Sequence, residues 1–267
     1  MRKAIEVLPQ SSYKSVLSKP DEGLVALTYL CLLDWPDGQK RQCFVKIFHL
    51  NEGIGVFNEI LGYLLTKFEG LPVASKAGIL ILPEQLKKEI GKPVASVAFV
   101  TSRIEGKTPS SFYKIKDMLN FKALYDVLGN WEKLHQTIAF DEWVANQDRN
   151  LGNVVIGTNK SVTLIDHSNM PVGLNWTPAM LDTTLCPRNV LGEVFRANPS
   201  LPQKMEILKG ASGQRKAYES AKEEINYWAD NLLTATQKSE VMKFLEVRAE
   251  QSRMRLSKKY GVLAGVA

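Results

Sequence analysis

The polar residues with the clearest chemical potential lie in one short segment, residues 141–153 (DEWVANQDRNLGN), and in an aspartate that follows it. Asp148 and Asn153 are five residues apart, and Asp166 comes thirteen residues after Asn153. Phosphoryl transfer from ATP needs a carboxylate that orients the acceptor hydroxyl and takes its proton. It also needs an amide and a second carboxylate that hold Mg²⁺. We therefore expect Asp148 to be the catalytic carboxylate, and Asn153 and Asp166 to be the magnesium ligands.

Such a site also needs a cation for the phosphates, and residues 42–49 (QCFVKIFH) provide one. Strand alternation places Lys46 mid-strand on an otherwise aromatic face. Residues 56–68 follow with apolar side chains at helical spacing, and Glu59 lies beside that apolar stripe. We expect Lys46 to contact the α- and β-phosphates as a point charge, and Glu59 to hold the ammonium in place.

The strands that carry these residues belong to the first part of the chain. Residues 24–35 and 42–49 are rich in β-forming residues and flank a Pro-Asp-Gly turn at residues 36–38, which predicts a β-hairpin. Two more strands are predicted at residues 77–82 and 94–103. The second strand of the hairpin has three apolar residues on one face: Cys43, Val45 and Ile47.

The second part of the chain has helical periodicity interrupted by one small hairpin. Residues 115–138 carry an apolar stripe that predicts a packed core helix, split near Gly129. Two short apolar runs, at residues 154–156 and 162–165, predict the hairpin. Because a hairpin fixes its two ends close together, it can bring the amide and the second carboxylate to one metal ion.

These elements predict an α+β protein with two lobes. A β-rich N-terminal lobe over residues 1–105 would carry the phosphate side of the site. A mainly α-helical C-terminal lobe over residues 106–267 would carry the catalytic loop and the metal hairpin. Helices are expected from residue 187 onward, with breaks near residues 198–202 and 210–213. The length of 267 residues suits this arrangement and leaves little room for an additional domain.

The same residues resemble those of a known family. The string NQDRNLGN followed by LIDHS resembles the catalytic loop and metal-binding aspartate of HipA-like kinases, in the phosphatidylinositol 3/4-kinase-like branch of the protein-kinase fold. CFVKIF and NEILGYLLTKFEGLPVA resemble the family's lysine strand and following helix, so the resemblance covers residues 40–170. It implies a two-lobed protein-kinase-like fold that uses ATP and Mg²⁺ to phosphorylate serine or threonine of a protein substrate. The family's positions fall on Lys46, Glu59, Asp148, Asn153 and Asp166.

The sequence departs from the family pattern at three places. Asn150 stands where lipid-kinase relatives carry histidine, and an Asp-His-Ser string replaces Asp-Phe-Gly after the hairpin. No GxGxxG loop precedes the lysine strand. Residues 10–23 (QSSYKSVLSKPDEG) are expected to cover the phosphates instead, with Lys14 or Lys19 as a further cation.

Other residues near these motifs are expected to have supporting roles. An adenine-binding hinge would fall at residues 101–104, beginning with Thr101 and Ser102, with contacts through backbone groups. Asn146 is expected to brace the catalytic loop by side-chain hydrogen bonds. Arg149 is expected either to bind phosphate or to pair with a carboxylate of the loop, and the structural role is favoured. The plain alternative for Lys46 is a strand lysine that keeps its charge in solvent.

The substrate and partners follow less directly. The resemblance implies a toxin of a toxin–antitoxin pair or a self-phosphorylating regulator, with an antitoxin or regulatory protein as partner. A small-molecule or lipid kinase is an alternative, because one fold hosts many substrates. A catalytically silent nucleotide-binding module is another alternative, although the joint presence of the three polar residues argues against it.

Charge and cysteine content set further expectations. Of the net charge of +6, residues 203–260 supply +4, with cations that include Arg248, Arg255 and Lys259 at the end of the last helix. A solvated helix end explains them, because the helix dipole favours each by about 0.3–1 kcal/mol. Nucleic acid is therefore not expected as a direct ligand. With three cysteines, no CxxC motif, no signal peptide and no bilayer-length apolar run, we expect a cytoplasmic protein without membrane contact.

Overall fold

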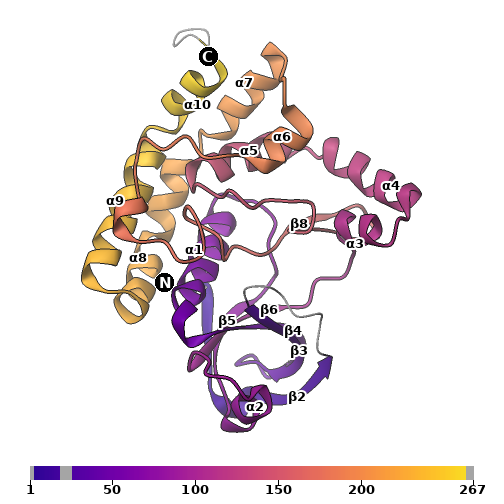
Figure 1. Ribbon diagram of the computed structural model, residues 1–267, viewed down its shortest axis with the longest axis vertical. Coiled ribbons are helices and arrows are strands. Elements are labelled where there is room, and N and C mark those ends of the chain that lie inside the picture. Colours follow the sequence, from indigo (N-terminus) through magenta and orange to yellow (C-terminus); the bar gives the residue numbers. More distant parts are fainter. Residues whose placement is uncertain (1–2, 19–25, 263–267) are drawn as a thin grey trace.

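The computed structural model describes residues 3–18 and 26–262 of the chain and shows a mixed α+β protein (Figure 1). A six-stranded sheet with the short helix α2 (Glu84–Ile90) forms one end of the molecule, and most of the helices form the other. Helix α1 (Ile54–Phe68) lies between these two parts. The α+β class expected from the sequence is confirmed.

The sheet has the order β1-β5-β6-β4-β3-β2, and only the β1–β5 pair is parallel. Its strands are β1 (Ile5–Leu8), β2 (Tyr13–Ser18), β3 (Ala26–Asp34), β4 (Lys40–Phe48), β5 (Ala77–Ile81) and β6 (Val97–Ser102). Strands β3 and β4 form the predicted hairpin. Gly38 takes a positive φ of 78° in its turn, which glycine adopts without steric cost. The register of the hairpin places Lys46 opposite Thr28.

The two faces of β4 are covered by different parts of the chain. Cys43, Val45 and Ile47 are fully buried in an apolar cluster on the α2 side of the sheet, as strand alternation predicts. Lys46 lies on the opposite face and lines a cavity. Phe48, on that same face, is buried against α1. The prediction for the face of Lys46 is therefore confirmed.

The expectation of a loop over residues 10–23 is wrong for the part that the structure describes. Residues 10–12 form a 3-10 turn, and β2 then pairs antiparallel with β3, with register shifts between Tyr13 and Ser15 and between Val16 and Ser18. The side chains of β2 are half-buried or exposed, which suits its place at the edge of the sheet. Residues 19–23, with Lys19, lie outside the described residues.

Helix α1 joins the sheet to the rest of the chain. It packs against β4 and β6 and against α8, and one apolar core runs from the sheet through α1 into the C-terminal helices. The helices after the sheet are α3 (Pro109–Lys114), α4 (Met118–Gly129), α5 (Leu134–Trp143), α6 (Val190–Arg196), α7 (Leu201–Gly210), α8 (Gln214–Leu232), α9 (Ala235–Glu250) and α10 (Ser252–Tyr260). The predicted small hairpin consists of β7 (Val154–Ile156) and β8 (Val162–Leu164). Within the described residues, no helix has the length and apolarity needed to cross a membrane.

The predicted core stripe at residues 115–138 holds only in part. It divides into α4 and α5, and α4 ends at Gly129, as expected. Its first residues are not in the core: Ile115, Met118 and Leu119 are exposed. The reason is that α3 and α4 project from the edge of the molecule, so only the later turns of α4 meet the body (Figure 1).

The C-terminal cations are also placed differently from the expectation of a solvated helix end. Arg248 is fully buried and donates hydrogen bonds to the backbone carbonyls of Glu142 and Trp143. Burial, with the neighbouring charge of Arg255, lowers the pKa of Arg248 to about 9. Arg255 and Lys259 both contact the buried Glu142 carboxylate. These cations therefore hold α9 and α10 against α5, because the buried carboxylate and carbonyl groups of α5 need hydrogen-bond donors.

Candidate active site

A cavity of about 640 Å³ lies between the sheet and the β7–β8 hairpin. Five of the residues predicted from the sequence line it: Lys46, Glu59, Thr101, Asn153 and Asp166. Strand β4, helix α1, strand β6 and the two ends of the small hairpin each contribute at least one of them. The fold thus brings together polar residues that are up to 120 positions apart in the sequence.

Lys46 is at the centre of the charged part of this cavity. Its Nζ lies 2.6 Å from Glu59 Oε1 and 2.9 Å from Asp166 Oδ1. Burial alone would lower the pKa of Lys46, but the two carboxylates outweigh it and raise that pKa above its usual value. Burial acts against ionisation of Asp166 too, yet the Lys46 charge holds the pKa of this carboxyl well below its usual range. Lys46 and Asp166 are therefore both charged at neutral pH.

Glu59 connects the lysine to the chain segment that follows the hairpin. Its side chain is almost completely buried, and burial raises its pKa while Lys46 opposes the rise. Its second oxygen, Oε2, accepts a hydrogen bond of 3.2 Å from the backbone N–H of His167. One carboxylate thus fixes both the Lys46 ammonium group and the backbone next to Asp166.

Two further residues of α1 hold the same segment, and the sequence analysis did not identify them. Asn58 donates to the carbonyls of Ser168 (2.7 Å) and Leu174 (2.9 Å), and its Oδ1 accepts from Trp176 Nε1 at 2.9 Å. At Gly62, a Cβ atom would lie 2.1 Å from Cβ of His167, so only glycine permits this approach. An asparagine and a glycine inside an otherwise apolar helix are the sequence features that could have revealed this contact.

Asp166 has an uncommon backbone conformation. Its φ is +57°, in the left-handed region, which Asp tolerates better than most residues. Ser168 Oγ donates to its Oδ1 at 2.9 Å. Such conformations persist where the surrounding structure imposes them, and they are concentrated at functional sites.

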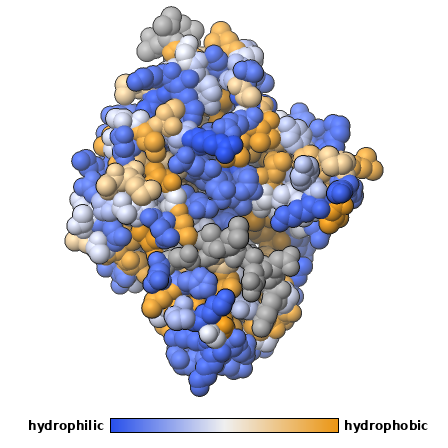
Figure 2. Space-filling model, viewed as in Figure 1, coloured by the Kyte–Doolittle hydropathy of each residue, from blue (hydrophilic) through white to orange (hydrophobic). Residues whose placement is uncertain are grey.

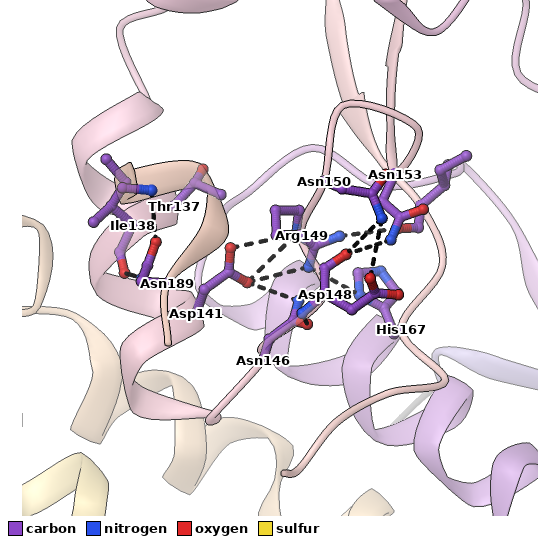
Figure 3. A network of polar contacts seen from close by, with 12 residues as sticks. Thr137, Ile138, Asp141, Asn146, Asp148, Arg149, Asn150, Asn153, His167 and Asn189 are labelled. Carbon is purple, nitrogen blue, oxygen red and sulfur yellow. Dashed lines mark hydrogen bonds and ion pairs between the residues drawn. The ribbon is translucent and has the colours of Figure 1, made fainter. Parts of the chain in front are cut away.

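The segment at residues 141–153 is organised around a buried ion pair (Figure 3). Arg149 and Asp141 are both fully buried, with 3.3 Å between Nη2 and Oδ1. Burial raises the pKa of Asp141, and the Arg149 charge opposes the rise. Asn146 donates to the Asp141 carboxylate at 2.9 Å and accepts from the backbone N–H of Asp148 at 3.1 Å. The supporting roles expected for Asn146 and Arg149 are confirmed by these contacts.

The loop is joined to the hairpin by Arg149. Its Nη1 donates to the carbonyl of Ile165 at 2.9 Å, and its Nη2 lies 3.3 Å from His167 Nδ1. Burial and the nearby Arg149 and Lys46 charges hold the pKa of His167 well below its ordinary value, so the ring is neutral. A neutral ring can accept a hydrogen bond from the guanidinium through Nδ1.

Asp148 lies beside the cavity, although it is not one of the residues that line it. Asn150 Nδ2 donates to Oδ1 at 3.0 Å, and Asn169 Nδ2 donates to Oδ2 at 2.8 Å. Asn153 Nδ2 donates to the Asp148 carbonyl at 2.6 Å. The Asp148 carboxylate is therefore held in one orientation by two amides, and its backbone is tied to a residue of the cavity wall (Figure 3).

The oxygen atoms available for a cation suit Mg²⁺. Within the described part of the chain, no hydrogen bond uses Asn153 Oδ1 or Asp166 Oδ2, and both residues line the cavity. The same described residues contain no group of three or more His, Cys, Asp or Glu that could hold a metal ion. Mg²⁺ is usually held by one or two protein oxygens with substrate phosphates and water, so two such ligands fit this ion.

The structure does not bring Lys14 or Ser102 to the cavity. Lys14 pairs with Asp34 at 2.9 Å, near the far end of β3. Since β2 is paired there rather than opposite Thr28, Lys14 lies about 17 Å along the sheet from the level of Lys46. Ser102 is buried, with its hydroxyl near Ser75 Oγ (3.1 Å). We therefore leave these two residues out of the site.

Comparison with known proteins does not assign the chain to a family. A scan against protein-family models found no match, and a search of the curated proteins found no similar sequence. The choice of a function therefore depends on the residues of the cavity and their geometry. The distinguishing feature of the cavity is that Lys46 contacts two carboxylates. Two oxygen atoms with no hydrogen bond in the described part of the chain, on Asn153 and Asp166, belong to the same cavity wall.

Proposed function

We propose that this protein is an ATP- and Mg²⁺-dependent phosphotransferase with a two-lobed protein-kinase-like fold. In this proposal residues 1–105 form the N-terminal lobe and residues 106–267 the C-terminal lobe. The most specific form of the proposal is a HipA-like kinase that phosphorylates serine or threonine of a protein. The observation that carries it is the contact of Lys46 Nζ with both Glu59 and Asp166 at the wall of the cavity.

A purely structural role would not account well for this contact. Burying the Glu59 carboxylate and most of the Lys46 side chain is costly, and a buried ion pair often stabilises a protein no more than apolar residues would. Here the charged groups also line a cavity large enough for a nucleotide, at about 640 Å³. A lysine from a strand, a glutamate from the next helix and an aspartate after a hairpin together form the phosphate and metal side of a kinase site.

Each residue has a defined role in the proposed reaction. Bound ATP would supply the phosphoryl group, and Mg²⁺ would balance its negative charge. Lys46 would bind the α- and β-phosphate oxygens, with Glu59 keeping the ammonium in position. Asn153 Oδ1 and Asp166 Oδ2 would hold the metal ion. Asp148 would accept the proton of the acceptor hydroxyl, since its carboxylate is oriented by two amides.

The base of the nucleotide fits the apolar part of the cavity. Aromatic and aliphatic side chains line this part: Phe44, Tyr63, Val73, Phe99 and Leu164. In the described part of the chain, the backbone N–H groups of Ile104 and Glu105 donate to no acceptor, and Ile104 lines the cavity. Ile104 is the last residue of the hinge expected from the sequence and Glu105 follows it, and their backbone N–H groups are our proposed contacts for adenine.

Incubation with ATP labelled at the γ-phosphate tests the proposal. The protein should transfer label in the presence of Mg²⁺, and Lys46→Ala should abolish transfer. Lys40→Ala is the matched control, because Lys40 is an exposed lysine of the same strand. Label on protein supports the HipA-like form, whereas label only on added small molecules or lipids supports the alternative kinases. Binding of ATP with no transfer to any acceptor would leave only the silent nucleotide-binding module.

A further inference from the structure

An exposed apolar cluster at the α3–α4 turn has no role in the proposed site. Four large apolar side chains fall within seven residues of the chain and are between 54% and 82% exposed. They are Tyr113, Ile115, Met118 and Leu119, which we call the apolar tip. The sequence places these residues in an apolar stripe, yet nothing in the described part of the molecule covers them. Burying them elsewhere would be favourable, by the hydrophobic effect.

The charges between these side chains are mainly positive. Lys114 and Lys116 alternate with the apolar residues, are exposed, and form no ion pair with any described residue. Asp117 is the one carboxylate within the turn, and it serves as the N-cap of α4, where it accepts from the backbone and side chain of Asn120. Lys122, on the next turn, is already paired with Asp126 at 2.8 Å. The turn therefore carries three charges without an ion-pair partner among the described residues, the two ammonium groups and the Asp117 carboxylate, and its net charge is +1.

The shape of this region favours a lipid surface over a protein partner. The tip lies at the end of two helices that project from the edge of the molecule (Figure 1), and Figure 2 shows apolar and charged side chains side by side along this edge. A stable protein–protein interface needs about 20–30 residues on each side. A projecting turn with four apolar side chains is much smaller than that, but such a turn can enter a bilayer interface, which has no fixed shape to match.

We propose that the α3–α4 turn binds the surface of a bilayer that contains anionic lipids. The side chains of Ile115, Met118 and Leu119 enter the boundary between headgroups and acyl chains, and Tyr113 lies at headgroup level. Lys114 and Lys116 contact the lipid phosphates. This binding is separate from the nucleotide cavity and does not depend on the proposed phosphotransfer.

Sedimentation with vesicles tests the apolar part of this proposal. The full-length protein should sediment with mixed phosphatidylcholine–phosphatidylglycerol vesicles, and only weakly with phosphatidylcholine alone. The double variant Ile115→Ser/Leu119→Ser should bind the mixed vesicles at least about tenfold more weakly. The control is Leu201→Ser/Met254→Ser, which changes two exposed apolar residues elsewhere and should bind like the wild type. No sedimentation of the wild type with mixed vesicles would overturn the proposal.

The charged part is tested by Lys114→Gln/Lys116→Gln. Each lysine near an anionic surface contributes about 1 kcal/mol, so this double variant should lose about 30-fold in vesicle affinity. Raising the salt concentration should weaken the wild type more than the variant. Lys216→Gln/Lys243→Gln changes two other exposed lysines and is the matched control. Equal losses in the two double variants would mean that general charge, and not this turn, causes binding.

A fluorescent label distinguishes insertion from association between proteins. Cys186 is the exposed cysteine among three free ones, so Cys186→Ser/Leu119→Cys can be labelled with an environment-sensitive dye at the tip. Emission should shift to the blue when anionic vesicles are added, and Cys186→Ser/Met254→Cys should show no shift. A blue shift that depends on protein concentration in the absence of vesicles would identify the tip as a protein interface and overturn the proposal.

Discussion

Gly62 provides a sharp test of how α1 positions the site. A glycine inside a helix normally destabilises it, so replacement by alanine stabilises an exposed helix by about 1 kcal/mol. At this position the structure predicts the opposite. The new Cβ would lie 2.1 Å from His167 Cβ, whereas ordinary contacts begin at 3.4 Å. The neighbour is the first side-chain atom next to the backbone and cannot turn away, so α1 and the 166–168 segment must separate.

The required shift sets the size of the effect. To lengthen the distance between the two Cβ atoms from 2.1 Å to 3.4 Å, the two segments must move apart by more than about 1 Å. Overpacking of this kind costs about 1–3 kcal/mol, which outweighs the gain in helix propensity. The same movement draws Glu59 away from Lys46 and from the backbone of His167. A displacement of about 1 Å in a positioned group can lower a catalysed rate about 100-fold. Gly62→Ala should therefore lose both stability and phosphoryl transfer.

The assay combines urea unfolding with the rate of label transfer from ATP. Gly210→Ala is the matched control, because its added Cβ would lie 2.7 Å from Cα of Gln136, a contact between α7 and α5 in which neither residue lines the cavity. It should lose stability and keep transfer within a few-fold of the wild type. His167→Gly removes the clashing atom, so Gly62→Ala/His167→Gly should transfer faster than the two single changes combined would predict. Wild-type transfer by Gly62→Ala would refute this account of α1.

Two other changes test the Asp148 part of the site, and a third tests a buried carboxylate outside it. Asp148→Asn should lower transfer by about 100- to 10,000-fold and leave ATP affinity unchanged in calorimetry, and a wild-type rate would exclude Asp148 as the base. Asn169→Ala frees one Asp148 oxygen, so the transfer rate should fall about tenfold with KM for ATP unchanged, while a change in KM alone would contradict a positioning role. Burial raises the pKa of Glu69 to about 7 from 4.5, so folding favours its protonated form. The free energy of unfolding should fall by about 3 kcal/mol as the pH rises from 4.5 through 7, and equal pH profiles for the wild type and Glu69→Gln would refute this.

The parts of the site that the sequence predicted are those encoded by local periodicity. Lys46 lies on the expected face because alternation along β4 decides which side chains share a face. Glu59 was found because helical spacing separates it from the apolar stripe. Asn153 and Asp166 were found because they flank the two ends of a short hairpin. Each of these relations needs only a few consecutive residues of sequence to be seen.

The remaining features depend on contacts between distant segments. Lys14 was misplaced because its position follows from the register of β2 on β3, which composition does not specify. Arg248 was expected in solvent, but it is buried and donates to backbone carbonyl groups more than 100 residues earlier in the chain. The exposure of Leu119 was missed because an apolar stripe identifies a face and does not say what covers it.

The contacts of α1 also bear on how such a site could be controlled. Asn58, Glu59 and Gly62 all meet the chain that follows the hairpin, while α8 packs on the same helix. Moving α1 so that Glu59 leaves Lys46 would strain the three hydrogen bonds of Asn58, two of them buried, and each buried group left unpaired costs about 1–3 kcal/mol. The neutral His167 is also fixed, between Arg149 and Gly62. A control step that displaces α1 would therefore have to offset the loss of these contacts as well as that of the Lys46–Glu59 pair.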